Sequence, residues 1–249
     1  MANGFDPRAT ASPHTAAYGR EGAAFDAGLR SYMLSVYNYM ASGVLLTGIV
    51  ALAMAYSGAV MSLINPETGR PSGLGWVVTL APLALVMILS FGINRISSGT
   101  AKALFWAYAG LVGASLSTLL LVYTGSSVAQ TFFATAAGFA SLSLWGYTTK
   151  RDLSGWGSFL LIGLVGLLIA MVLNAFWPSG PMGLTISVIG VLIFAGLTAY
   201  DTQKIKSMYF VVQGSGELAA KSAVMGALTL YLDFINMFLF LLRLFGDRR

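Results

Sequence analysis

Residues 223–242 read AVMGALTLYLDFINMFLFLL, twenty residues in which Asp233 is the one charged side chain. About 20 consecutive, mostly apolar residues suffice for a helix that crosses a bilayer, so this run predicts a membrane span. A carboxylate inside the bilayer costs at least about 2.5 to 3.5 kcal/mol, and it persists where it meets a partner, water, a proton or a cation. Asp233 is therefore the first candidate functional residue.

The composition of the whole chain predicts an all-α membrane protein. Of its 249 residues 57% are hydrophobic and only 9% are charged, whereas a soluble domain of this length needs far more polar surface. The chain has no Cys, which excludes a disulfide framework or a thiolate metal site, and its single His14 lies in a polar N-terminal stretch. Hard oxygen ligands remain for a metal ion.

The hydrophobic runs predict seven transmembrane helices. We expect a flexible cytoplasmic tail at 1–31, a seven-helix membrane domain at 32–246 and a short C-terminal tail at 247–249. The predicted spans are 34–56, 76–93, 103–123, 128–147, 158–177, 185–200 and 223–244.

The distribution of positive charge predicts that the N-terminus is cytoplasmic. Ten Lys and Arg residues lie in the N-terminal tail and in the loops after the second, fourth and sixth spans, whereas the opposite loops contribute only Arg70. Three arginines at the C-terminus depart from this rule, because seven spans place them outside: Arg243, Arg248 and Arg249. A re-entrant last segment would remove the departure.

A second intramembrane carboxylate, Asp201, lies in GLTAYDTQKIK, residues 196–206. An apolar helix gives way here to Lys204 and Lys206, so we expect Asp201 just inside the cytoplasmic boundary. Taken alone, this pattern is more often a solvated helix end than a functional site. Together with LYLDFIN at 230–236, however, the chain closely resembles the Bax inhibitor-1 family, the transmembrane Bax inhibitor motif proteins.

The resemblance runs from about residue 32 to residue 246 and rests on the order and spacing of several weak motifs. These are AYAGLVGASLS at 107–117, QTFFATA at 130–136, GYTTKRDLS at 146–154 and FLFLLRLFG at 238–246. The resemblance implies a bundle of six helices around a central seventh. It also implies a pH-sensitive calcium leak. The expected location is a bacterial inner membrane, with the endoplasmic reticulum as the second choice.

The family's gating dyad of two aspartates falls on Asp201 and Asp233. A family arginine from the second helix, which can bond one of the aspartates, falls on Arg95 as a candidate dyad partner. The positive-inside rule would also supply an arginine at that position.

The dyad makes chemical sense without the analogy. Two carboxyls within hydrogen-bond reach cannot both ionise cheaply, so they share one proton. Loss of that proton leaves two repelling anions, which separate or recruit a divalent cation, and carboxylate oxygens suit calcium. We expect weak, transient calcium binding at Asp201 and Asp233, with calcium as the permeant ion and no tightly bound cofactor. Proton loss is expected to move the last helix and open a narrow path.

Three other interpretations stay open. Asp233 could simply hydrogen-bond across helices with Asn236 or nearby hydroxyls. Paired membrane aspartates also occur in presenilin-like intramembrane proteases, but Leu230 and Leu232 stand where those need glycines, so we expect no enzyme. The third alternative is a non-transporting membrane regulator that binds a membrane-protein quality-control protease, an ATP-dependent enzyme, through the N-terminal tail. Beyond that, the partners we expect are the lipid bilayer, calcium and protons, with no nucleic acid.

Overall fold

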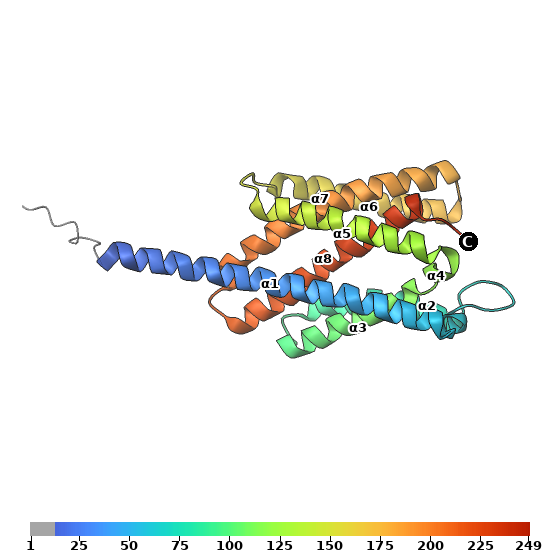
Figure 1. The fold of residues 1–249 in the computed structure, drawn as a ribbon, viewed down its shortest axis with the longest axis horizontal. Coiled ribbons are helices and arrows are strands. Elements are labelled where there is room, and N and C mark those ends of the chain that lie inside the picture. Colours follow the sequence, from blue (N-terminus) through green and yellow to red (C-terminus); the bar gives the residue numbers. More distant parts are fainter. Residues whose placement is uncertain (1–12) are drawn as a thin grey trace, which may run out of the picture.

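The structure is a computed structural model that describes the backbone of residues 13–249 and the side chains from residue 26 onward (Figure 1). Within this part of the chain the regular elements are helices, and no strand is formed. Their bounds are α1 Pro13–Tyr56, the 3-10 helix η1 Ala59–Leu63, α2 Gly73–Gly92, α3 Ser98–Leu116, α4 Leu119–Val122, α5 Gly125–Thr148, α6 Ser154–Phe176, α7 Gly180–Val212 and α8 Gly216–Phe245.

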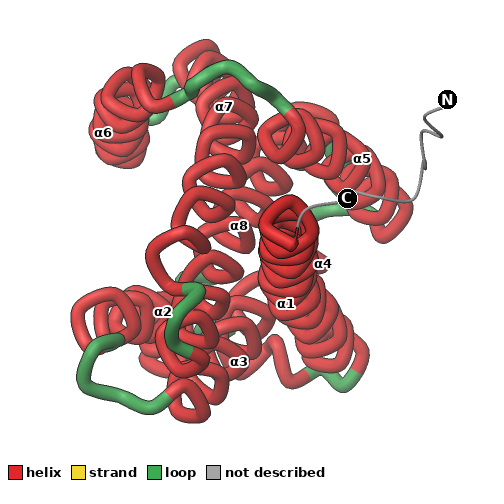
Figure 2. The backbone as a smooth tube through the Cα atoms, turned by 90° about the vertical axis from the view of Figure 1, so that its left-hand side faces the viewer, coloured by secondary structure: helices red, strands yellow, loops and turns green. Residues whose placement is uncertain are grey.

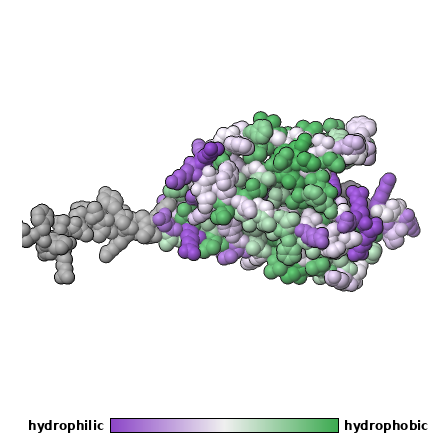
Figure 3. Space-filling view, turned by 45° about the horizontal axis from the view of Figure 1, so that its top comes forward, coloured by the Kyte–Doolittle hydropathy of each residue, from purple (hydrophilic) through white to green (hydrophobic). Residues whose placement is uncertain are grey.

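Each predicted span coincides with a long helix, except that the third is divided into α3 and the short α4. Six spans of the described chain are long and apolar enough to cross a membrane; α3 and α4 together form one of them, and α5 is not among the six. The face of α5 that lies inside the bundle explains this difference, because it carries buried hydroxyl residues that lower the hydropathy: Ser127, Thr131, Thr135 and Ser143. Figure 3 shows an apolar band across the visible face, with polar residues toward both ends.

The last helix, α8, lies at the centre of the bundle (Figure 2). It has the largest buried share of the six apolar spans and packs against α7, α1, α5 and α3. The other two helices lie further out, since α2 packs mainly on α3, and α6 mainly on α7. The central seventh helix was predicted correctly, but its six neighbours do not form a simple ring.

The predicted boundary at residue 31 falls within a helix. Helix α1 begins at Pro13 and continues without a break to Tyr56, so residues 13–31 are helical. This segment is rich in alanine and has no proline after its first residue, which favours continuation of the helix. The remainder of the predicted tail, residues 1–12, lies outside the described residues.

The C-terminus lies beside the α4–α5 connection. Arg249 N–H donates to Val122 O at 2.9 Å, and Thr124 N–H donates to Asp247 O at 2.9 Å. With its 30 residues, α8 is about 45 Å long, enough to pass through the whole bundle. The last segment is therefore not re-entrant. The alternative that would have removed the three C-terminal arginines from the outside is not formed.

At the opposite end of the bundle, the beginning of α8 is tied to the beginning of α3. The backbone N–H and the hydroxyl of Ser98 donate to the two carboxylate oxygens of Glu217, at 2.7 and 2.8 Å. A carboxylate is favourable at a helix N-terminus because the first backbone N–H groups have no partner within the helix. This link helps to hold the start of the central helix.

Candidate functional site

Two glycine contacts hold α7 and α8 together on either side of the predicted dyad. A Cβ on Gly190 of α7 would lie 2.6 Å from the ring of Phe240, and one on Gly226 of α8 would lie 3.0 Å from Ile205. A Cβ on Gly190 would force the Phe240 ring to move, and one on Gly226 would need Ile205 to shift slightly, so both glycines bring the two antiparallel helices close together. The segments between these contacts bring residues 201 and 233 face to face.

Asp201 lies inside α7 rather than at its end, which corrects the prediction. The predicted span stopped at Tyr200, but the helix continues for twelve residues to Val212. No glycine or proline interrupts residues 197–212, and Ile205 is buried while Lys204 is exposed. Lys204 therefore lies on the outer face of a helix that is still packed in the bundle, whereas Lys206 is half-buried and donates to Tyr147 O.

The two aspartates meet in the interior. Asp201 is 9% exposed and Asp233 is 4% exposed, and their side chains are hydrogen-bonded to each other. Such a bond needs a proton on one carboxyl, because two carboxylates have no donor between them. The Oδ2 atom of Asp233 has no hydrogen-bond partner among the described residues. The pair is thus a buried carboxyl dyad with one incompletely satisfied oxygen.

The interhelical bond that could have explained Asp233 alone is not formed through Asn236. Its amide group donates instead to Leu232 O of the same helix, at 2.8 Å. The side chain that interacts with Asp233 is the carboxyl of Asp201.

Arg95 is not brought to the dyad. It is exposed in the α2–α3 connection, where its backbone N–H donates to Gly92 O. Among the side chains of residues 26–249, the one ion pair joins Glu217 and Lys221 at 3.8 Å. The positive charge that acts on Asp201 is that of Lys204, one turn further along α7. The position of Arg95 fits the positive-inside pattern rather than a bond to either aspartate.

The donor set at the dyad is small. No group of three or more His, Asp or Glu side chains comes together in the part of the chain that the structure describes. Calcium prefers six to eight oxygen ligands, so two carboxyls would need water and backbone carbonyls to complete the shell. The arrangement suits brief contact with a passing cation better than retention of one.

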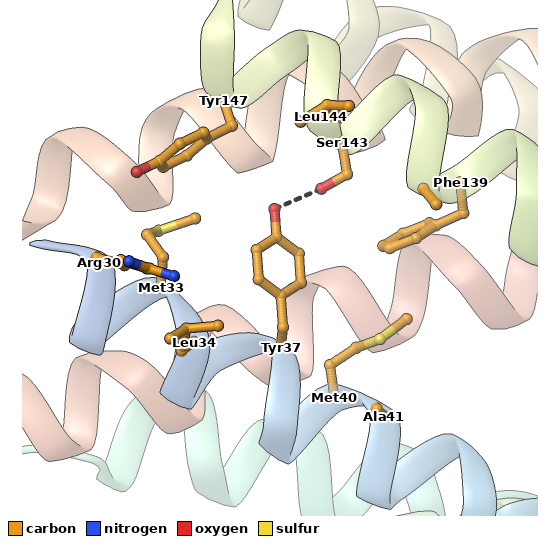
Figure 4. A pocket seen from close by; sticks show the side chains of 11 residues that line it. Arg30, Met33, Leu34, Tyr37, Met40, Ala41, Phe139, Ser143, Leu144 and Tyr147 are labelled. Atoms are coloured by element: carbon orange, nitrogen blue, oxygen red, sulfur yellow. Dashed lines mark hydrogen bonds between the residues drawn. The ribbon is translucent and has the colours of Figure 1, made fainter.

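A chain of hydroxyl groups ends next to Asp201, and sequence reasoning missed it. The oxygen atoms of Tyr37 and Ser143 are 2.6 Å apart, and those of Ser143 and Thr202 are 2.9 Å apart. Thr202 donates to Thr198 O, so with one proton per hydroxyl the donors run from Tyr37 through Ser143 to Thr202. Tyr37 and Ser143 also line a cavity of about 510 Å³ between α1 and α5 (Figure 4).

Aromatic rings fill the interface between α5 and α8 beside Asp233. Phe234, the residue after Asp233, has its ring centre 5.6 Å from those of Phe132 and Phe139, in edge-to-face contacts. Such contacts are favourable for aromatic pairs. The hydroxyl chain and the aromatic cluster meet at the cavity between α1 and α5, which Tyr37, Ser143 and Phe139 line.

Comparison with known proteins agrees with this architecture. The sequence model of the family described as inhibitor of apoptosis-promoting Bax1 matches residues 29–249. The chain is 48% identical to protein RP147 of Rickettsia prowazekii over 225 residues, covering 90% of this chain and 93% of that protein. It is 47% identical to the inner membrane protein YbhL of Escherichia coli over 225 residues, covering 90% and 94%. The chain belongs to the Bax inhibitor-1 family and is an integral membrane protein.

Proposed function

We propose that this Bax inhibitor-1 family protein is a pH-sensitive calcium leak of the bacterial inner membrane, gated by the proton that Asp201 and Asp233 share. The observation that carries the proposal is the mutual hydrogen bond of two buried carboxyls on neighbouring helices. A protonated pair holds α7 and α8 together. A fully ionised pair repels itself and attracts a divalent cation.

The proposal uses α8 as the moving element. This helix lies at the centre of the bundle, so a shift at Asp233 changes its contacts with several neighbours at once. The rings around Phe234 pack directly beside the dyad, and their rearrangement would open the α5–α8 interface. The buried hydroxyls of Thr131 and Thr135 on α5 would then offer oxygen atoms to a cation.

Calcium flux into proteoliposomes loaded with a calcium dye tests the proposal. Flux is measured at about pH 6, 7 and 8, around the neutral range in which a carboxyl pair can exchange its shared proton. The wild type should show a pH-dependent flux, and both Asp201→Asn and Asp233→Asn should flatten that dependence. Asp152→Asn is the matched control, because it changes an exposed carboxyl outside the bundle interior.

Two results would contradict the proposal. An unchanged pH response in both dyad variants would remove the gating role of the carboxyls. Flux no greater than that of empty liposomes would favour the non-transporting regulator, which binds a quality-control protease, over a leak.

A further inference from the structure

The C-terminal arginines that depart from the positive-inside pattern line a cavity. Arg243 and Arg248 contribute to a space of about 640 Å³ among the ends of α6, α7 and α8, together with the polar side chains of Asn174 and Ser187. No carboxylate among the described side chains forms an ion pair with either arginine. Two guanidinium groups at one cavity, without a protein anion, are suited to an external one.

An apolar groove continues from this cavity along the seam between α6 and α7. Its volume is about 820 Å³, and Ile186 lines both spaces. Gly166 on α6 leaves room along it, because a Cβ at this position would meet nothing within 4 Å. Helix α6 packs mainly on α7 and stands away from the rest of the bundle, so the seam faces the bilayer (Figure 2).

The dimensions of the groove match a lipid chain. Its lining on α7 runs from Met182 to Gly196, which corresponds to about 21 Å of helix at 1.5 Å per residue. One leaflet contributes about 15 Å of the roughly 30 Å hydrocarbon core. An acyl chain that starts at the arginine end therefore finds an apolar surface over its full depth in that leaflet.

We propose that the arginine cavity and the α6–α7 groove together bind one anionic phospholipid, with the phosphate between Arg243 and Arg248 and an acyl chain along the groove. Arginine forms paired hydrogen bonds with phosphate oxygens, and two guanidinium groups favour a headgroup of net negative charge over a zwitterionic one, whose choline cation they repel. The bound lipid would fill the seam behind α7, the helix that carries Asp201. The site does not depend on the calcium leak.

Native mass spectrometry of the full chain in detergent tests this proposal with phosphatidylglycerol and phosphatidylcholine offered at equal concentration. The wild type should retain one phosphatidylglycerol, with a preference of roughly tenfold or more over phosphatidylcholine, since both arginines attract the net charge of the anionic lipid. The combined change Arg243→Gln and Arg248→Gln should abolish this preference. Arg70→Gln should not, because Arg70 lies in the α1–α2 connection at the same end of the bundle and does not line the cavity.

Gly166→Phe tests the groove. A Cβ at Gly166 meets nothing within 4 Å, so the new ring should fill the groove without disturbing the helix and reduce retention of both lipids. Gly138→Phe is the matched control, because Gly138 on α5 is equally open and does not line the groove. Circular dichroism melting of each variant checks that the fold is kept.

Three outcomes would overturn the proposal. One is equal retention of the two lipids by the wild type, and another is an undiminished preference in the arginine variant. The third concerns inorganic phosphate alone. If phosphate raised the melting temperature of the protein as much as phosphatidylglycerol does, and still did so in Gly166→Phe, the cavity would be a site for a free anion instead of a lipid.

Discussion

At Tyr231 one hydroxyl group ties the central helix to two of its neighbours. The hydroxyl oxygen lies 2.6 Å from that of Thr47 on α1, and Thr47 in turn donates to Ala109 O on α3 at 2.9 Å. The Tyr231 ring also makes edge-to-face contacts with Phe105 and Tyr108. Tyr231 is fully buried and lies on the side of α8 opposite to Asp233, so it anchors the helix away from the dyad.

Tyr231→Phe should lower the stability of the protein in detergent by about 0.6 to 1.5 kcal/mol, because it removes one interhelical hydrogen bond and keeps the ring. Thermal unfolding followed by circular dichroism measures the loss. Tyr56→Phe is the control, since Tyr56 is 87% exposed. Equal melting temperatures for the two variants would show that the Thr47 bond contributes nothing.

Single residues differ in how well the sequence reveals them. Asp201 and Asp233 could be predicted, because a carboxylate within an apolar run needs a special reason. Tyr231, Ser143 and Thr202 could not, because hydroxyl residues are common at membrane packing positions and their partners lie far away in the sequence. Arg95 was predicted wrongly as a dyad partner, since a charge rule alone accounts for an arginine between two spans.

Among the helices, the packing of α5 on α7 depends on Gly146. A Cβ at this position would collide with the backbone of Ala199, two residues before Asp201. Backbone cannot rotate out of the way as a side chain can, so the two helices would have to separate. This contact keeps the dyad segment of α7 against the bundle.

Gly146→Ala should destabilise the protein by about 1 to 3 kcal/mol, the usual cost of overpacking. Gly138→Ala on the same helix should leave stability unchanged or raise it by up to about 1 kcal/mol, because nothing lies within 4 Å of its Cβ and alanine favours the helix. Thermal unfolding in one detergent compares them. Similar melting temperatures for the two variants would refute the close approach of α5 and α7.

The ends of the helices were harder to predict than their centres. Hydropathy locates the part of a helix that lies in the bilayer, but α1 and α7 continue beyond it, to Pro13 and to Val212. In the α7 extension Lys204 lies on the outer face, while Thr202 and Ile205 remain buried. A hydropathy window averages over both faces and therefore ends the helix too early.

For the whole molecule, the structure divides the connections between two opposite ends. The C-terminus and the α4–α5 connection share one end, and the α5–α6 connection lies 24 residues of helix away at the other. The positive-inside pattern predicts that the end with Lys150 is cytoplasmic. Because the chain has no cysteine, a single introduced thiol can report the side on which it lies.

Cells stripped of their outer membrane, with the inner membrane intact, are treated with a membrane-impermeant maleimide. We expect the reagent to label Glu67→Cys and Arg249→Cys in these cells. Lys150→Cys should be labelled only after the inner membrane is permeabilised. All three positions are exposed, so access to the reagent depends on sidedness. Labelling of Lys150→Cys alone in intact cells would reverse the predicted orientation. Labelling of Glu67→Cys and Arg249→Cys from different sides would contradict the bundle itself.

The all-helical membrane fold as a whole followed from composition and from the order of the motifs. The arrangement of its layers did not, because hydropathy cannot distinguish a helix that faces lipid from one that faces other helices. Helix α5 shows this clearly: its buried Thr131, Thr135 and Ser143 make it the least apolar span although it packs against the central helix.

The most direct test of the account is a double-mutant cycle in calcium flux with Asp201→Asn, Asp233→Asn and the double variant. Groups that act as one unit show strongly non-additive effects, because removing either of them already disables the unit. We expect the double variant to have the same pH-independent flux as each single variant. If the two single changes instead alter the flux independently, so that their effects multiply in the double variant, Asp201 and Asp233 do not share the proton that gates the path.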